Sequence, residues 1–281
     1  MIAHDIEVVP SAYQQIELSA ECNFENLKQF AEILAYMMGK ELERFSSDAK
    51  GFESRFAPTY WLQLTGVPIE YFNIGFINDS KYVNNVLHSM YRYLNRLGLP
   101  GMVYLTEHSF SQLTEQARRQ WTDVGVMPHM VLVQKTPLPT EFAKTPIFIQ
   151  PVTNLSQLSE AISIQAALGF DPNVIGTTMG EKLLTNPAVQ TYVATDFDTE
   201  IPVSTIMVIS QGPVVGIWNM ATKEQFQHKG IGKALLVHVL NQLISQGKYV
   251  FQLISTEEGF KLYSETGFKI IQELHTLVKE K

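Results

Sequence analysis

Residues 223–236 read KEQFQHKGIGKALL, and this stretch holds the pattern Gln-x-x-Gly-x-Gly directly before a run of apolar residues. The apolar positions recur at helical spacing, so we expect a helix over 230–246, with Gly247 ending it. The Val- and Ile-rich residues 214–221 predict a strand just before the pattern. A helix that starts after a strand presents unpaired backbone N–H groups and the positive end of its dipole. The stretch therefore predicts an anion-binding junction within an α/β fold.

The two glycines of this junction allow an anion to approach closely. Gly230 and Gly232 carry no side chain, so a phosphate can reach the backbone, while Lys229 and Lys233 add positive charge nearby. The Gly-Lys-Ser/Thr ending of a Walker loop is absent, and the third glycine of a dinucleotide fingerprint is missing beyond Ala234. A pyrophosphate is the expected occupant. The plainer alternative is a helix start with two small residues and no ligand.

Strands and helices alternate through the rest of the chain. In the second half we expect strands over 147–152, 190–195, 202–210, 249–254 and 269–278, and helices over 154–168 and 257–266. In the first half we expect helices over 24–42, 82–97 and 111–124, and strands over 60–64, 69–77, 102–106 and 130–134. Both halves thus predict the α/β class.

A proline-rich segment divides the chain nearly in half. Residues 136–146 contain three prolines and are expected to be a linker between domains at 1–135 and 147–281. Three local echoes indicate that the first domain repeats the second: YFNI at 71–74 with IWNM at 217–220, LG at 97–98 with QG at 246–247, and WTDVGV at 121–126 with YSETGF at 263–268. Chance, aided by the common helix–Gly–strand junction, is the alternative explanation.

The order of motifs in the second half is similar to that of a known family. Gln-x-x-Gly-x-Gly after a strand, then a buried strand, then LYSETGF at 262–268, resembles the GNAT superfamily of acyl-CoA-dependent N-acyltransferases. The first half resembles a degenerate copy, since NDSK at 78–81 precedes its helix without Gly-x-Gly or Gln. The resemblance implies tandem GNAT-like halves with mixed, largely antiparallel twisted sheets flanked by helices. It implies a cofactor site in residues 147–281 and none in 1–135.

The resemblance also implies roles for particular residues. The expected pyrophosphate contacts are the backbone amides of Gln227, His228, Lys229, Gly230, Ile231, Gly232, Lys233 and Ala234. Main-chain groups of Met220, Ala221 and Thr222 would pair with the pantetheine arm of acetyl-CoA, and an N–H near Met220 could polarise the thioester carbonyl. Tyr263 stands where the family often has the general acid that protonates the departing thiolate. The alternative for Tyr263 is a packed aromatic side chain.

Some positions depart from the family pattern. Thr256 and Gly259 stand where the family often has Asn and Ala, which is expected to weaken one cofactor contact. No acidic residue lies in the strand 214–221, where some members keep a Glu as general base. Water, or a carboxylate such as Glu224 or Glu257, could serve instead, although both acids are more simply interpreted as solvated surface groups.

Composition narrows the classes of partner and compartment. A net charge of −7 without a basic tail argues against nucleic-acid binding, and no apolar stretch is long enough for a membrane span. The single cysteine, Cys22, cannot form an internal disulfide, which fits a cytoplasmic protein. The histidines are scattered, so no metal site is expected.

The interpretation that follows is an enzyme. We expect an N-acyltransferase that moves an acetyl or other short acyl group from coenzyme A to a small-molecule or peptide amine by direct attack. A non-catalytic acyl-CoA-binding regulatory module is the alternative, favoured by the missing strand carboxylate, and a third possibility is a tandem acyltransferase with a non-amine or peptide-like acceptor. The acceptor pocket is expected in variable loops such as 171–186, and nothing in the sequence indicates an oligomeric state.

Overall fold

The computed structural model describes residues 53–57, 60–78, 81–140, 143–166, 171–173 and 180–280, together with Ala31, Leu34, Met38 and Gly39. Cys22, the predicted helix 24–42 apart from these four residues, and the middle of the loop 171–186 lie outside the described residues. The chain separates into two compact units. Unit 1 is Met1–His129 with Ile270–Lys281, and unit 2 is Met130–Lys269.

Unit 1 is built on strands in the order β1-β2-β3-β4-β11-β5. Their bounds are β1 Glu53–Ala57, β2 Tyr60–Leu64, β3 Asn73–Ile77, β4 Gly101–Thr106, β5 Thr122–Val133 and β11 Lys269–Lys279. Strands β1, β2 and β3 pair antiparallel, β3 and β4 pair parallel, and β11 pairs antiparallel with β4. The unit also contains η1 Glu70–Phe72, α4 Val83–Leu97, α5 Glu107–Ser111 and α6 Glu115–Arg118. Helix α4 buries Val83, Leu87, Met90 and Leu94, one residue per turn, so its apolar face completes this core.

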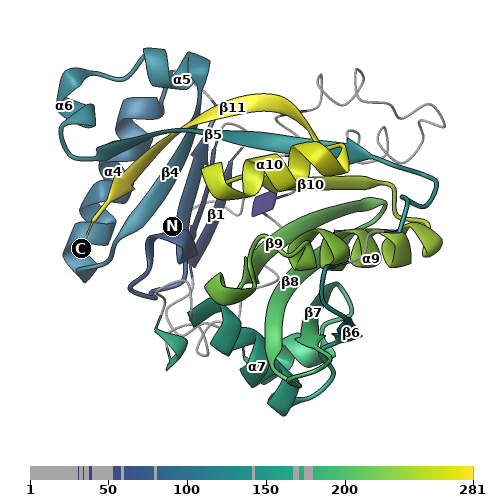
Figure 1. Ribbon diagram of the computed structural model, residues 1–281. Helices are drawn as coiled ribbons and strands as arrows, with labels where there is room; N and C mark the ends of the chain where they lie inside the picture. The colour runs from purple at the N-terminus through teal and green to yellow at the C-terminus, as the bar shows by residue number, and fades with distance from the viewer. Residues whose placement is uncertain are drawn as a thin grey trace. The chain divides into compact units, whose positions relative to one another are not determined.

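Unit 2 contains the last residues of β5, from Met130 on, and strands in the order β5-β10-β9-β8-β7-β6. The bounds are β6 Ile147–Pro151, β7 Val189–Asp196, β8 Pro202–Gln211, β9 Val214–Thr222 and β10 Val250–Ile254. Strands β6 to β9 pair antiparallel in chain order, whereas β9 and β10 are parallel. Its helices are α7 Leu155–Ala166, η2 Glu181–Thr185, η3 Glu224–Phe226, α9 Ile231–Ser245 and α10 Glu257–Thr266 (Figure 1).

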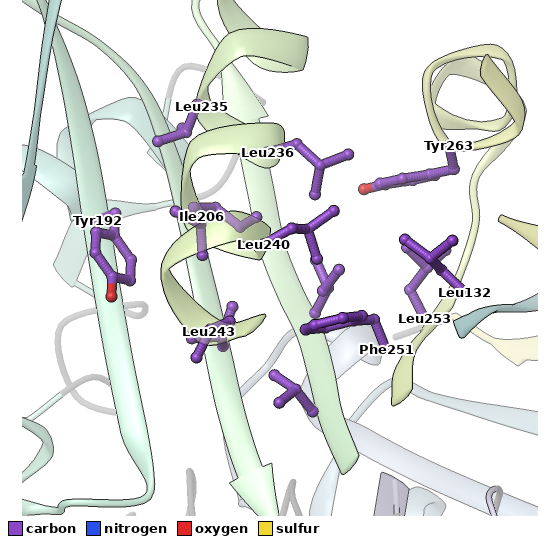
Figure 2. Packing of buried hydrophobic residues seen from close by; sticks show 14 of the residues in the cluster. Leu132, Tyr192, Ile206, Leu235, Leu236, Leu240, Leu243, Phe251, Leu253 and Tyr263 are labelled. Carbon is purple, nitrogen blue, oxygen red and sulfur yellow. The ribbon is translucent and has the colours of Figure 1, made fainter. Parts of the chain in front are cut away.

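The core of unit 2 lies between α9 and the strands behind it. Leu236, Leu240 and Leu243 of α9 belong to one buried cluster with Ile206 and Phe251 of the sheet, and Leu236 extends toward the Tyr263 ring of α10 (Figure 2). Helix α9 is apolar on most of its surface, because α10 covers a second side of it. The burial holds α9 rigidly, which fixes the position of its N-terminal end.

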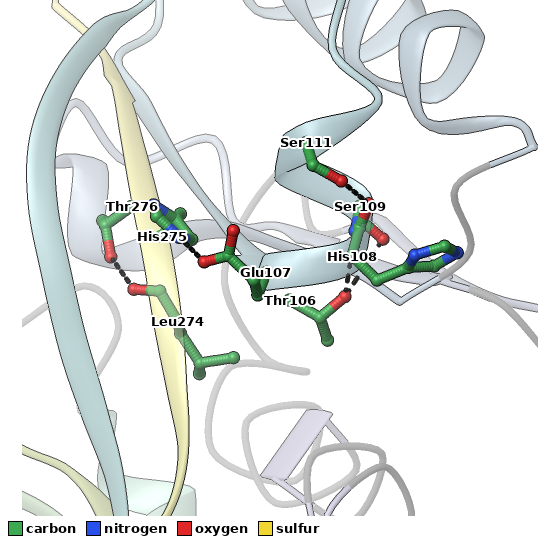
Figure 3. Close-up of polar contacts among 8 residues, drawn as sticks. All are labelled: Thr106, Glu107, His108, Ser109, Ser111, Leu274, His275 and Thr276. Atoms are coloured by element: carbon green, nitrogen blue, oxygen red, sulfur yellow. Dashed lines mark hydrogen bonds and ion pairs between the residues drawn. The ribbon is translucent and has the colours of Figure 1, made fainter.

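Strand β11 is tied into unit 1 by polar as well as backbone contacts. His275 Nε2 lies 2.6 Å from Glu107 Oε2 at the start of α5 (Figure 3). The His275 ring also stacks on the Phe110 ring, with centroids 3.8 Å apart. The Arg118 guanidinium lies over the same Phe110 ring, 4.0 Å from its centroid. The end of the chain is therefore an integral strand of unit 1. The division into domains at 1–135 and 147–281 with a linker at 136–146 stays a prediction.

Most predicted elements occur within a residue or two of their expected ends, but four differ: the helix over 111–124, the strands over 69–77 and 130–134, and the unpredicted β1. The helix expected over 111–124 is wrong: α5 and α6 are short, and β5 begins at Thr122. Thr114 caps α6 by accepting from the Ala117 N–H, which starts a new helix where a continuous one was expected. The strand expected over 69–77 begins as η1, and β1 was not predicted.

The class is the one expected: a mixed α/β protein whose strands are mostly antiparallel and flanked by helices. In the described part of the chain, no helix has the length and apolar character needed to cross a membrane.

Candidate cofactor-binding and catalytic site

Two parallel strands of unit 2 separate from each other. Their register joins Val250 with Val214, Phe251 with Val215 and Gln252 with Gly216. Beyond Gly216 the pairing ends, although β9 continues to Thr222 and β10 to Ile254. The later residues of β9 therefore turn one edge away from β10. The edge of β9 beyond Gly216 is therefore not paired with β10.

A bulge in β9 accompanies the split. The register pairs Trp218 with Met207 and Ala221 with Thr205, so Asn219 and Met220 together oppose one residue of β8. Asn219 adopts a left-handed conformation with φ of 48°. From α7, the Gln165 side chain donates to the Asn219 carbonyl at 3.4 Å. This contact spans 54 positions of sequence and was not foreseen from the sequence.

The side chain of Asn219 carries an unsatisfied polar atom. Its Nδ2 is buried and has no hydrogen-bond partner among the described residues. An orphaned buried donor costs about 1–3 kcal/mol, which a bound acceptor would recover. Asn219 therefore carries an unpaired buried donor on the bulged part of β9.

The loop after β9 exposes a run of backbone amides. Within the described part of the chain, the N–H groups of His228, Lys229, Gly230, Ile231 and Gly232 have no acceptor. His228 and Gly230 have φ of 59° and 80°, and such left-handed residues bend successive peptide N–H groups into a concave nest. The nest lies at the N-terminus of α9, where the helix dipole adds positive potential. The arrangement suits an anion with several oxygens.

The first and last amides of the predicted pyrophosphate-binding run, those of Gln227 and Ala234, already donate hydrogen bonds within the protein. The Gln227 N–H donates to Glu224 O at 3.1 Å, and the Ala234 N–H donates to Gly230 O at 2.9 Å. The Gln227 side chain also donates to Thr222 O at 3.1 Å and so fastens the loop to the end of β9. The unbonded amides of His228 to Gly232 lie between these two bonds in the described part of the chain.

Gly232 allows α9 to begin close against β9. A Cβ atom at this position would lie 3.3 Å from Thr222 Oγ1 and 3.5 Å from Met220 Cε. Thr222 is itself held by Ser204, with 2.8 Å between their hydroxyl oxygens. The predicted residues Met220, Thr222 and Gly232 thus meet at one point, where the split strand joins the amide nest.

Tyr263 points from α10 toward the same place. Its ring is buried, its hydroxyl end lies toward α9 (Figure 2), and its hydroxyl lies 3.6 Å from the Met220 sulfur. Burial raises the pKa of the Tyr263 phenol well above its ordinary value, so the hydroxyl keeps its proton.

The departures from the family pattern on α10 have local explanations. A Cβ at Gly259 would lie 2.8 Å from the Tyr263 ring, so a larger residue there would displace the tyrosine. Thr256 is the N-cap of α10, its hydroxyl accepting from the Gly259 N–H at 3.3 Å. The two positions therefore support Tyr263.

Acids and lysines near the site lie at its surface. Glu224 and Glu257 are exposed, as expected for solvated side chains. Lys229 Nζ lies 4.9 Å from the centre of the Phe226 ring, which holds the lysine beside the nest. Hydrogen bonds from Thr199 lower the pKa of Asp196, and the positive charge of Lys229 contributes a smaller effect in the same direction. Among the described residues no cluster of potential metal ligands occurs.

Comparison with known proteins locates this site within a family. Residues 187–270 match the model of the acetyltransferase (GNAT) domain. No curated protein matches the chain in sequence. Among solved structures, the chain is similar to a GCN5-related N-acetyltransferase from Kribbella flavida, with a TM-score of 0.63 and 12% identity over 87% of this chain and 95% of that chain.

Two further structures extend the likeness across both halves. A tandem GNAT protein from the clavulanic acid biosynthesis pathway has a TM-score of 0.57 and 11% identity, covering 86% of each chain. A GCN5-related N-acetyltransferase from Sphaerobacter thermophilus has a TM-score of 0.53 and 14% identity, covering 80% of this chain and 82% of that chain. At these identities the likeness shows the fold. Together with the matching segment, it identifies the C-terminal half of the chain as a GNAT domain.

Proposed function

We propose that the C-terminal half binds acetyl-CoA, or another short acyl-CoA, and transfers the acyl group to an amine. The observation that carries the proposal is the junction of the split strands with five unbonded amides, from His228 to Gly232. A pyrophosphate supplies the anionic oxygens that such a nest binds. The pantetheine arm supplies amide groups that can pair with the free edge of β9. These two features support the binding of the pyrophosphate and of the pantetheine arm.

Each part of the site has a role in this proposal. The amides of the nest hold the pyrophosphate, and Met220, Ala221 and Thr222 pair with the pantetheine arm. The bound thioester supplies the acyl group. The Met220 N–H, at the bulge, would donate to the acyl carbonyl oxygen and stabilise negative charge there. Lys229 and Lys233 add positive charge beside the nest.

Tyr263 is the proposed proton donor to the leaving sulfur. Its hydroxyl is protonated and already lies within hydrogen-bond distance of a sulfur atom, that of Met220. The same geometry would let it donate to a thiolate in the split. The incoming amine would lose its proton to water or to a carboxylate, since β9 itself carries no acid.

The test of binding uses calorimetry with coenzyme A and with pantetheine. We expect coenzyme A to bind at least about tenfold more tightly, because only it carries the pyrophosphate. Equal affinities would contradict the assignment of the nest. Release of free thiol from acetyl-CoA against a panel of small amines and amino-terminal peptides then tests catalysis.

A second candidate function is an acyl-CoA-binding regulatory module. It is favoured by the absence of an acid on β9 and by the exposed positions of Glu224 and Glu257. Tight binding of coenzyme A with thiol release no faster than background, over the whole amine panel, would support this function against the enzyme.

A further inference from the structure

The segment between the two halves is bound to α9. Residues 136–146, here called the strap, are described at 136–140 and 143–146. The Leu138 N–H donates to Asn241 Oδ1 at 2.7 Å, and Asn241 Nδ2 donates back to Leu138 O at 3.0 Å. Leu138 and Ala143 also pack against the core of unit 2. This reciprocal pair of hydrogen bonds fixes the strap on α9, which is not expected of a flexible linker.

The far end of the strap reaches the amide nest. The Lys144 N–H donates to the Lys229 carbonyl at 2.8 Å. Two residues later, Pro146 O accepts from the Phe197 N–H at 3.0 Å, which fastens the strap to the end of β7. The strap is thus held on both sides of the bond that it makes to the loop.

The Lys144 bond has a geometric consequence for the nest. The Lys229 carbonyl and the Gly230 N–H belong to one planar trans peptide unit, so they point in opposite directions. A donor that holds the carbonyl on one side therefore aims the Gly230 N–H to the other. Without that donor this peptide could rotate, because Gly230 tolerates a wide range of backbone angles.

We infer that the strap positions the nest for its anion, with the main-chain N–H of Lys144 as the positioning group. The inference rests on the proposed binding of coenzyme A, and it adds a function for the segment between the halves. In this inference Lys144 does not contact the ligand. The Lys144 N–H acts on the nest through the Lys229–Gly230 peptide.

The test replaces the donor and keeps a matched control. Lys144→Pro removes the N–H, whereas Lys144→Ala keeps it and removes only the side chain. We expect Lys144→Pro to weaken coenzyme A binding about tenfold in calorimetry, and Lys144→Ala to change it by less than about threefold. Pantetheine affinity, which does not depend on the nest, should be equal in the two variants.

A second variant guards against misfolding at position 144. Asn241→Ala breaks the reciprocal bonds at the other end of the strap and leaves the loop sequence intact. We expect a smaller loss of coenzyme A affinity, about threefold, again without a change for pantetheine. If Lys144→Pro and Asn241→Ala both bind coenzyme A like the parent, or lose both ligands equally, the positioning role is wrong. A parent that fails to bind coenzyme A would instead overturn the proposed function, and the inference with it.

Discussion

The two units each contain a pair of parallel strands connected by a helix, α4 between β3 and β4 and α9 between β9 and β10, and the pairs differ where their pairing ends. In unit 1, β3 stays paired with β4 to its last residue, with Ile77 opposite Leu105. In unit 2, β9 leaves β10 after Gly216 and runs six residues further. A closed pair uses its backbone groups within the sheet, whereas an open pair offers them to a ligand. The two parallel pairs thus differ in where their pairing ends, and the open pair is the one that we propose binds the ligand.

Helices α4 and α9 are alike at their C-terminal ends and differ at their N-terminal ends. Both α4 and α9 end on a left-handed glycine, Gly98 with φ of 64° and Gly247 with φ of 83°. At the other end, α9 begins at Gly230 with φ of 80°, while α4 begins at Tyr82 with φ of −110° and no such glycine. The C-terminal glycine that both helices share serves the fold, because it turns the chain into the next strand. The N-terminal end, where the two helices differ, is the end of α9 that we propose binds the pyrophosphate.

The strand registers suggest a different alignment of the two halves from one of the echoes. If the glycines that end the two helices, Gly98 and Gly247, are taken as equivalent, Met102 corresponds to Phe251, and these residues pair with Ile74 and Val215. On this alignment Gly75 corresponds to Gly216 and Asn78 to Asn219. The echo of 71–74 with 217–220 stays a prediction, because similar letters in two strands do not fix which residues pair.

The largest expected effect in this comparison is the loss of coenzyme A affinity when a side chain is placed in the nest. Gly230→Val should reduce coenzyme A affinity by more than about 100-fold, because a branched side chain strains a left-handed residue and fills the space of a phosphate oxygen. Gly247→Val is the matched control, since it imposes the same strain at the other end of α9. Both variants should lose about 1–3 kcal/mol of stability. Calorimetry should show loss of binding for Gly230→Val alone.

The next effect should be confined to the stability of unit 1. Asn73 is fully buried, and its amide bonds the backbone of Thr65, Val67, Ile69 and Pro100, and weakly that of Gly66. Asn73→Ala should therefore lower the free energy of unfolding by about 3 kcal/mol, since several buried groups lose their partner. Coenzyme A affinity should not change.

Asn219→Ala supplies the comparison in unit 2. Asn219 Nδ2 makes no bond in the described part of the chain, so its removal relieves an unpaired buried donor. This gain offsets the cost of about 1 kcal/mol for alanine in the left-handed backbone, so we expect the stability of Asn219→Ala to stay close to that of the parent. Denaturant unfolding of the two variants checks the difference. Equal losses of stability would show that the two asparagines have similar structural roles.

Sequence could predict the elements that rest on local patterns. The helix 257–266 and the strand 60–64 have the bounds expected, because caps, glycines and apolar spacing lie within the elements themselves. It could not predict that β11 pairs with β4, or that β9 bulges at Asn219, since both depend on residues far away in sequence. The glycine loop was visible as a motif. The strap was expected to be a linker from its prolines, and its bond to Lys229 is a tertiary contact.

A smaller effect should distinguish chemistry from packing. Tyr263→Phe should lower turnover about tenfold with coenzyme A affinity and melting temperature nearly unchanged, because only a proton donor is lost. Tyr104→Phe is the control in unit 1, where burial likewise raises the pKa of the phenol. Thiol release from acetyl-CoA, corrected for uncatalysed hydrolysis, measures both. A Tyr263→Phe variant with the parent's turnover would leave solvent as the proton donor.

The smallest effect is a change of slope with pH, and the two tyrosines should share it. Burial holds the pKa of Tyr263 and Tyr104 above the ordinary value, so above about pH 10 the folded protein keeps protons that the unfolded chain releases. Stability from each phenol is therefore complete below about pH 10 and falls as pH rises beyond it, by at most about 1.4 kcal/mol per pH unit.

Each Phe variant should lose this dependence for its own residue. Denaturant unfolding between about pH 9 and pH 11 should show the parent falling more steeply than either variant, by about 1 kcal/mol over the last pH unit. Lysine and arginine titrations cancel in the difference, since the variants keep them all. Parallel curves for Tyr263→Phe would mean that the phenol meets water in the folded state, and would remove the reason for expecting it to stay protonated. Equal slopes for both variants, with turnover lost only in Tyr263→Phe, would show that burial is common to the two units and that chemistry belongs to one.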